Sequence, residues 1–257
     1  MGATVHSGNR GRMIPVQAMP YKGAATIRLR WAPAMRIDIY SDTVCPWCYL
    51  GKRRFELAVA ARPQYEARVT WRPFELNPTM PIEGVDRASY LLSKFGDAER
   101  VAAAHAELKR QGEASGIEFR FDLIERMPNT RLSHLLIAHA ARSRRQGAIR
   151  GLASEVKDRV MRAFFEEGSD IGDIETLVRL GVEAGLVERE CRAALILRAG
   201  LDGVLAAERH ASVLKITGVP TFIFDGLYTI SGAQEAGILA GVFDQVAHFA
   251  AARDVAR

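Results

Sequence analysis

Polar and apolar residues follow two different periods along the chain, and this pattern predicts a mixed α/β fold. The two types alternate over Arg36–Tyr40, as they do in a strand, and a helical pattern follows over Tyr49–Ala60. A second strand is predicted over Ala67–Phe74. A strand, a helix and a second strand in this order are the usual beginning of a parallel sheet.

The segment that follows is almost wholly helical in pattern, and strand signals return near the end. The predicted helices cover residues 129–140, 151–165, 173–184 and 188–209, the last with a break near Gly200. The later elements are a hairpin of strands 221–224 and 227–230, turning at Asp225 and Gly226, and a helix over 233–251. We therefore predict an N-terminal extension over 1–34, a discontinuous α/β domain over 35–85 and 210–252, and a helical domain over 86–209.

The first 34 residues differ from the rest of the chain in composition. They contain five of the 35 basic residues and none of the 30 acidic ones, so the remainder is formally neutral. Such a segment is typical of a disordered basic tail, and Pro15, Pro20 and Lys22 interrupt every apolar run long enough for a secretory signal. Without a basic stripe on the folded part we expect no nucleic-acid partner.

Later segments lack the 18 uncharged apolar residues of a membrane span, so no membrane partner is expected. The expected location is the cytoplasm, where cysteine pairs are more often catalytic or metal-binding than structural. The sequence does not distinguish a monomer from a homodimer.

Candidate chemistry lies at the first junction between strand and helix, in Cys45-Pro46-Trp47-Cys48. A cysteine at a helix N-terminus lies beside unpaired N–H groups and the positive end of the helix dipole, which favours the reactive thiolate. Pro46 suits the first helical turn, and Trp47 offers an apolar surface beside the thiols. The motif therefore predicts thiol–disulfide exchange.

Two other readings of the cysteine pair compete with this one. A structural zinc site normally has four ligands, and the only further cysteine is Cys191, with no His pair at finger spacing. Buried unreactive thiols are the second alternative, which the proline and the junction make less favourable. Cys191 itself falls in a helical run and is expected to have no catalytic role.

The sequence predicts only minor roles for the charged residues near the motif. The side chains of Lys52, Arg53 and Arg54 are expected in solvent, where their charges are screened. Asp42, three residues before Cys45, either caps the turn or accepts a proton, and we favour the cap. His134 and His139 are spaced i and i+5 on a predicted helix, a poor spacing for a metal.

Six segments in order resemble the FrnE branch of the DsbA-like thioredoxin family. They are Asp42–Lys52, Trp71–Pro78, Arg126–Thr130, Glu167–Asp173, Gly218–Pro220 and Ser231–Gln234. The resemblance spans about Met35 to Phe249 and implies a thioredoxin fold interrupted by a helical domain. It also implies that Cys45 is the nucleophile and Cys48 the resolving thiol.

The same resemblance implies that Pro220 is a cis-proline facing the disulfide, with Val219 before it and Thr221 after it, so that these residues form a wall that pairs with substrate backbone. The predicted mechanism is exchange through a mixed disulfide with protein or low-molecular-weight thiol substrates. It needs no metal or organic cofactor, although glutathione is a candidate redox partner. The direction of electron flow stays open.

Related families supply a rival from another enzyme class. Kappa-class glutathione transferases and 2-hydroxychromene-2-carboxylate isomerases share the inserted helical domain, but they typically have Ser or Thr where this chain has Cys45. That difference favours redox chemistry over glutathione-dependent isomerisation or transfer. A third reading is a holdase chaperone in which the thiols are incidental.

Overall fold

The computed structural model describes residues 34–143 and 151–255. These residues belong to one compact unit. The predicted extension over 1–34 therefore lies, except for its last residue, outside the described residues. Within the described ranges, no helix combines the length and the apolar character that crossing a membrane requires.

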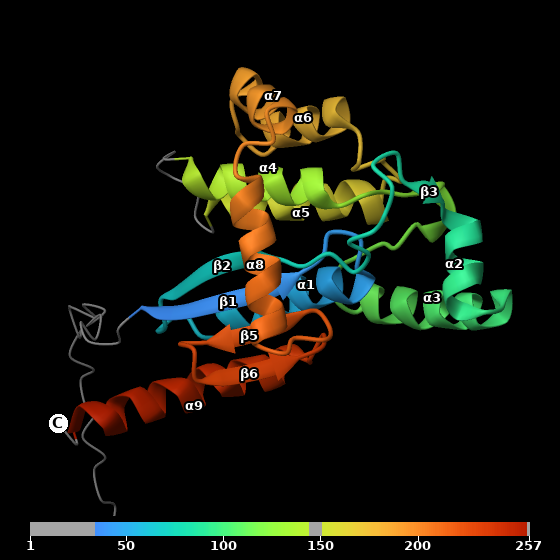
Figure 1. The fold of residues 1–257 in the computed structure, drawn as a ribbon. Helices are drawn as coiled ribbons and strands as arrows, with labels where there is room; N and C mark the ends of the chain where they lie inside the picture. The colour runs from blue at the N-terminus through green and yellow to red at the C-terminus, as the bar shows by residue number, and fades with distance from the viewer. Residues whose placement is uncertain (1–33, 144–150, 256–257) are drawn as a thin grey trace, which may run out of the picture. The chain divides into compact units, whose positions relative to one another are not determined.

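Four strands form the central sheet, in the order β2-β1-β5-β6 (Figure 1). The strands are β1 (Met35–Ser41), β2 (Ala67–Pro73), β5 (Thr221–Phe224) and β6 (Tyr228–Ser231). β1 and β2 run parallel because the helix α1 (Pro46–Ala60) connects them, whereas β5 is antiparallel to both β1 and β6. Tyr40 lies opposite Thr221 in this sheet. The end of β1 is therefore beside the start of β5.

Successive side chains of β1 point to opposite faces of the sheet and so pack against two different layers of helices. Ile37 and Ile39 share a buried apolar cluster with Phe55 of α1 and Phe243 of α9 (Ala236–Val255). Tyr40 faces the other way, and its hydroxyl lies 2.7 Å from His210 Nδ1 in a hydrogen bond. His210 belongs to α8 (Leu201–Val213), which crosses the sheet in Figure 1. α1 and α9 thus cover one face of the sheet, and α8 covers the other.

Between β2 and β5 the chain is mostly helical. The helices that precede α8 are α2 (Arg87–Phe95), α3 (Ala98–Glu113), α4 (Arg131–Arg142), α5 (Leu152–Phe165), α6 (Ile174–Glu183) and α7 (Glu188–Ile196). A short 3₁₀ turn (Phe121–Leu123) and a small antiparallel sheet of β3 (Val85–Asp86) with β4 (Arg126–Met127) interrupt them. The sequence reading missed this sheet, because strands of two residues are too short to show an alternating pattern.

The predicted fold class is confirmed: a small mixed sheet is interrupted, between its second and third strands, by a run of helices. The break expected near Gly200 separates α7 from α8, and Gly200 adopts a left-handed φ of 96° there. The division into an α/β domain and a helical domain at 86 and 209 stays a prediction. Helix α8 runs across the second of these proposed boundaries.

Candidate active site

The two cysteines of the motif lie at the start of α1. Cys45 is the N-cap residue, and Pro46 occupies the first helical position, where a missing N–H costs no hydrogen bond. The backbone N–H groups of Cys48 and Tyr49 both donate to the carbonyl oxygen of Cys45, at 3.0 and 3.2 Å. Both cysteines are free thiols and are buried. The helix thus begins directly at the candidate nucleophile.

The segment before β5 forms one wall beside Cys45. The Val219–Pro220 peptide is cis, and the Cys45 thiol donates to the Val219 carbonyl oxygen with a sulfur–oxygen distance of 3.8 Å. Pro220 packs against α1 at Gly51, where an added Cβ would lie only 2.8 Å from Pro220 Cγ. Thr221 is buried, and its hydroxyl donates to Gly218 O at 2.8 Å.

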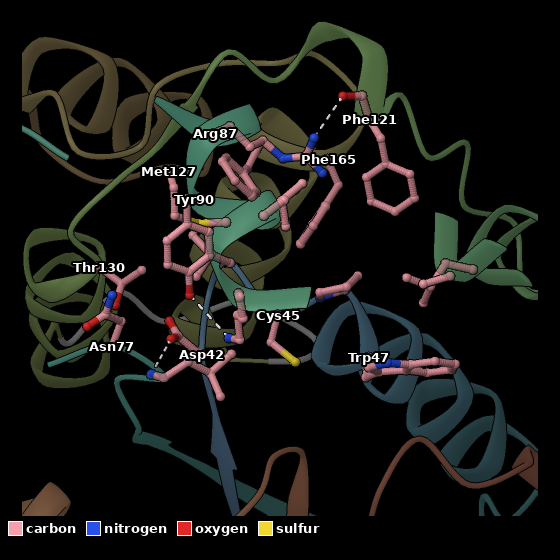
Figure 2. A pocket seen from close by; sticks show the side chains of 18 of the residues that line it. Asp42, Cys45, Trp47, Asn77, Arg87, Tyr90, Phe121, Met127, Thr130 and Phe165 are labelled. Carbon is pink, nitrogen blue, oxygen red and sulfur yellow. Dashed lines mark hydrogen bonds between the residues drawn. The ribbon is translucent and has the colours of Figure 1, made fainter. Parts of the chain in front are cut away.

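Cys45 lines a cavity of about 400 Å³ (Figure 2). Its predicted wall residues Pro46, Trp47 and Val219 also line this cavity, whereas Pro220 and Thr221 are not among the lining residues. Trp47 keeps 39% of its surface exposed, and Figure 2 shows it on the far side of Cys45 from Asp42. The predicted residues Pro46, Trp47 and Val219 therefore surround the same cavity as Cys45, and Pro220 and Thr221 follow Val219 outside its lining.

The remaining walls of the cavity come mainly from α2, α3 and the segments around them. Aromatic side chains, among them Tyr90, Phe121 and Phe165, alternate with the two cations Arg87 and Lys94. The Arg87 guanidinium donates to Phe121 O at 3.3 Å and lies over the Phe121 ring. Such a cavity suits a ligand with an apolar body and an anionic group.

Comparison with known proteins places this geometry in a family. A family model described as a DSBA-like thioredoxin domain matches residues 36–243. The chain belongs to the DsbA-like thioredoxin family. This membership agrees with the FrnE-type resemblance of the sequence.

Three relatives illustrate the range of similarity. The Bacillus subtilis protein YwbO is 34% identical over 200 residues, which cover 77% of this chain and 90% of YwbO. The structure is also similar to a probable DsbA oxidoreductase from Streptomyces coelicolor, with 36% identity, a TM-score of 0.73 and coverage of 82% and 89% of the two chains. A putative protein disulfide isomerase from Nitrosomonas europaea shares the fold at 14% identity, with a TM-score of 0.64 and coverage of 83% and 97%.

The electrostatics of this DsbA-like cysteine pair differ from the simple expectation of a thiolate at Cys45. A hydrogen bond with the Cys48 side chain, burial and the negative charges of Cys48 and Asp42 raise the pKa of the Cys45 thiol, whereas the backbone N–H of Cys48 lowers it. Two thiolates this close would repel each other, so only one of the two thiols gives up its proton readily. The position at the helix terminus therefore does not outweigh the causes that raise the pKa of Cys45.

Asp42 does not cap α1, contrary to the role that the sequence favoured. The α1 N-terminus has no side-chain cap, and the Asp42 carboxylate instead accepts a hydrogen bond from the backbone N–H of Leu76 at 2.7 Å. Burial on its own raises the pKa of Asp42, but hydrogen bonds from His134, Leu76 and Thr130 outweigh it and hold the pKa below its usual value. Asp42 lines the cavity as a buried carboxylate.

The expectation of solvent-exposed basic residues on α1 was wrong for two of the three. Lys52 is 1% exposed and bonds Glu56 Oε1 at 2.6 Å and Asp158 Oδ1 at 2.7 Å. Arg54 is also buried, and it donates to Ala233 O at 2.7 Å. These two side chains connect α1 to its neighbours, because Lys52 pairs with the partly exposed Asp158 of α5 and Arg54 binds the carbonyl oxygen of Ala233.

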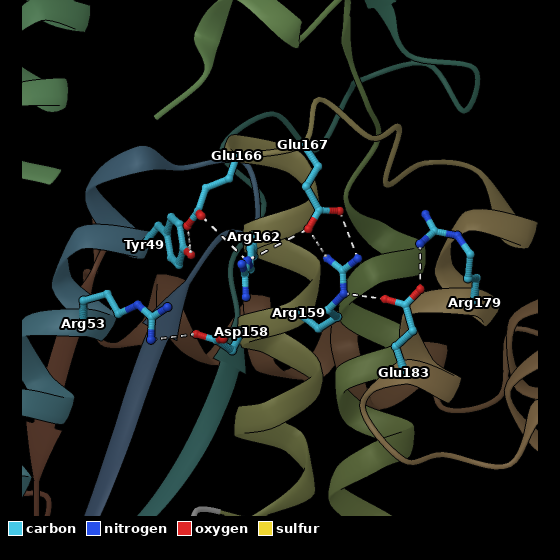
Figure 3. A network of polar contacts seen from close by, with 9 residues as sticks. All are labelled: Tyr49, Arg53, Asp158, Arg159, Arg162, Glu166, Glu167, Arg179 and Glu183. Atoms are coloured by element: carbon cyan, nitrogen blue, oxygen red, sulfur yellow. Dashed lines mark hydrogen bonds and ion pairs between the residues drawn. The ribbon is translucent and has the colours of Figure 1, made fainter. Parts of the chain in front are cut away.

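A wider network of polar contacts extends from this side of α1 (Figure 3). The Tyr49 hydroxyl donates to Glu166 Oε1 at 2.5 Å, and Arg53 lies 3.5 Å from Asp158 Oδ1. Farther out, Arg159 of α5 pairs with Glu167 and with Glu183. The network fixes α5 against the helix that carries the cysteines.

Sequence reasoning missed a second buried lysine close to the cysteines. Lys157 of α5 is 1% exposed, and its ammonium lies 5.0 Å from the centre of the Trp71 ring. Burial lowers the pKa of Lys157 to about 8, opposed by the negative charges of Cys48 and Asp42. An isolated lysine in a helical pattern gives no sequence signal of such a position, because burial depends on the packing of remote elements.

Proposed function

We propose that the protein is a thiol–disulfide oxidoreductase in which Cys45 attacks a substrate disulfide and Cys48 resolves the mixed disulfide. The observation that carries this proposal is the placement of Cys45 at the N-cap of α1, lining the cavity and facing the Val219 carbonyl. Cys48 follows one turn later in contact with Cys45, as a resolving thiol requires. The location proposed for this activity is the cytoplasm.

The cavity also bears on the substrate. Its volume of about 400 Å³ fits a small molecule, and the Arg87 and Lys94 side chains would attract carboxylate groups. Low-molecular-weight disulfides with carboxylates, of which oxidised glutathione is one, therefore join protein disulfides as proposed substrates. No metal or organic cofactor enters this mechanism.

The proposal is tested by measuring the reduction potential of the Cys45/Cys48 pair against a glutathione buffer, alongside insulin reduction. We expect the pair to equilibrate with glutathione, and the measured potential gives the direction of electron flow. Cys45→Ser should abolish exchange, and Cys48→Ser should accumulate a mixed disulfide with Cys45. Cys191→Ala is the matched control, because Cys191 is buried in α7 and should leave exchange unchanged. A wild-type protein that exchanges disulfides with neither form of glutathione and does not reduce insulin would contradict the proposal.

A second candidate function is a glutathione-dependent isomerisation or transfer, which the largely apolar cavity favours. The same Cys45→Ser variant separates the two functions. A hydroxyl at this position can hold a glutathione thiol but cannot form a disulfide, so isomerase or transferase activity would persist while exchange disappears. If the wild type has holdase activity but performs neither exchange nor glutathione-dependent isomerisation or transfer, and Cys45→Ser keeps that holdase activity, the thiols are incidental and both enzymatic proposals fail.

A further inference from the structure

A second cavity of about 400 Å³ lies outside the site described above, between α8 and the segment that follows β2. Glu75 of that segment and Glu208 of α8 both line it. The Oε1 atom of Glu208 is buried, and it has no hydrogen-bond partner among the described residues. Buried polar atoms are normally paired, so this carboxylate oxygen requires an explanation.

The neighbouring carboxylate, that of Glu75, is held in place by an arginine. Arg131 of α4 donates to both oxygens of Glu75, at 2.9 and 2.8 Å, and the Glu75 side chain is 2% exposed. Glu208 lies within hydrogen-bond reach of Glu75. Two ionised carboxylates cannot form a hydrogen bond with each other, because both only accept. A single proton on one of them turns the contact into a hydrogen bond and gives the buried oxygen its partner.

The charges around Glu208 favour this proton. The negative groups that act on it are Glu75 and, from the end of β1, Asp42, and the opposing positive charge is that of Arg131. Arg209, the next residue of α8, also lines the second cavity and is exposed. Burial, then the charge of Glu75 and the hydrogen bond with it, raise the pKa of Glu208 to about 7. The two carboxylates therefore hold one proton between them up to about neutral pH.

The two carboxylates belong to segments of the chain that also reach the Cys45 cavity. Leu76, the residue after Glu75, lines that cavity, and so does Val219 in the segment after α8. Ile216, between α8 and Val219, lines the second cavity. The contact between the carboxylates therefore joins two segments whose continuations form walls beside the thiol.

We propose that Glu75 and Glu208 form a pH-sensitive latch that controls access to Cys45. While the proton is present, the hydrogen bond between the two side chains fastens α8 to the segment after β2. When the proton is lost, two like charges repel each other, and the segments separate so that larger molecules reach the thiol. The latch does not depend on the oxidoreductase function proposed above, because it concerns access to Cys45 and not the reaction that follows.

The test compares the rates at which a small and a bulky reagent alkylate Cys45, with the modification assigned by peptide mapping. Iodoacetamide is the small reagent, and a maleimide that carries a polyethylene glycol chain is the bulky one. The ratio of the two rates reports access, because both reagents require the same thiolate. Glu208→Gln keeps the hydrogen bond to Glu75 at every pH through its amide N–H, and Glu208→Ala removes it at every pH. Asp202→Asn is the matched control, since Asp202 is an exposed carboxylate on the same helix.

We expect the bulky-to-small rate ratio of the wild type to rise with pH, with its midpoint near pH 7. The rise should be about tenfold, the change in an opening equilibrium that corresponds to one lost hydrogen bond to a charged group. Glu208→Gln should keep the low ratio and Glu208→Ala the high ratio at every pH, whereas Asp202→Asn should follow the wild type. In urea denaturation, the wild type should lose stability relative to Glu208→Gln as the pH rises from 4.5, the ordinary glutamate pKa, to about 7, because the folded chain binds more protons over this window.

Two results would overturn the latch. One is a wild-type ratio that stays constant through pH 7, and the other is a Glu208→Gln protein whose ratio rises as that of the wild type does. If Glu208→Gln does not fold by circular dichroism, Glu208→Ala decides, since its ratio must exceed that of the wild type below pH 7. Either failure leaves the oxidoreductase function standing, and a protein that performs no disulfide exchange can still show the latch.

Discussion

Lys52 and Lys157 are equally buried, yet they lie in regions of opposite character. Lys52, on the side of α1 that faces α5, has two carboxylate partners within 2.7 Å. Lys157, near the cysteines, faces the ring of Trp71. Asp158, a partner of Lys52, is the residue that follows Lys157 on α5. Helix α5 therefore gives the α1 contact a carboxylate that pairs with Lys52. It gives the site an ammonium that, within the described residues, contacts an aromatic ring and not a carboxylate.

The difference separates charges that hold the structure together from charges that serve the thiols. A buried ammonium with two carboxylates is compensated, and the ionised form of Asp158 is favoured by Lys52 and Arg53 despite burial. The ammonium of Lys157 has no carboxylate partner at ion-pair distance among the described residues, and burial lowers its pKa to about 8 although Cys48 and Asp42 oppose this effect. Sites that favour a reactive state are commonly stabilised less well than their surroundings.

The largest effect is expected where the paired charge is broken. Lys52→Met leaves Asp158 and Glu56 without the buried ammonium, and we expect the free energy of unfolding to fall by about 3 kcal/mol. Urea denaturation at pH 7 measures this loss. A variant as stable as the wild type would show that the Lys52 contacts contribute nothing to the fold.

The same substitution at the other lysine should have the opposite sign. Lys157→Met removes a buried charge whose burial outweighs the attraction of the nearby negative groups, and we expect an increase in the free energy of unfolding of about 2 kcal/mol at pH 7. Alkylation of the cysteines should become slower in this variant, because the ammonium no longer favours a thiolate. Destabilisation at pH 7 would contradict the comparison of the two lysines.

The pH dependence of that gain follows from the lowered pKa of Lys157. Below about pH 8 the folded and unfolded chains both hold the proton, and the gain is present in full. Between about pH 8 and the ordinary lysine pKa of 10.5, the unfolded chain binds more protons, so the wild type gains stability as the pH rises. The difference between Lys157→Met and wild type should therefore shrink over this window in denaturation curves.

A smaller effect is expected within the network of Figure 3. Tyr49→Phe removes the hydroxyl that donates to Glu166, and the free energy of unfolding should fall by about 1 kcal/mol. The rate of disulfide exchange should stay that of the wild type, since the hydroxyl faces away from the cavity toward α5. A large loss of exchange would show that the two regions are coupled.

The smallest effect is expected at the rim of the same network. Arg179 is half exposed and pairs with Glu183 four residues later on α6. Arg179→Ala should change the free energy of unfolding by less than about 0.5 kcal/mol. Thermal denaturation at low and at high salt measures this change. A salt-dependent loss of stability above that size would show that the Arg179–Glu183 pair contributes more than an exposed ion pair.

Local patterns predicted the fold class and the position of the two cysteines at the start of a helix. The alternation over β1, the Cys-x-x-Cys spacing and the Pro46 signal are properties of adjacent residues, and the helix begins where they indicate. The burial of Lys52 is different, because its partner Asp158 is 106 residues away. The contact between Asp42 and His134 joins two elements that are distant in the sequence, and neither element reveals the other.

The close packing at Gly51 also limits what a redox reaction can move. Pro220 occupies the space that a larger side chain at residue 51 would need, one turn beyond Cys48. This contact holds α1 in place against Pro220. We therefore expect that a bond made or broken at the first turn leaves the later turns of α1 in place against the sheet.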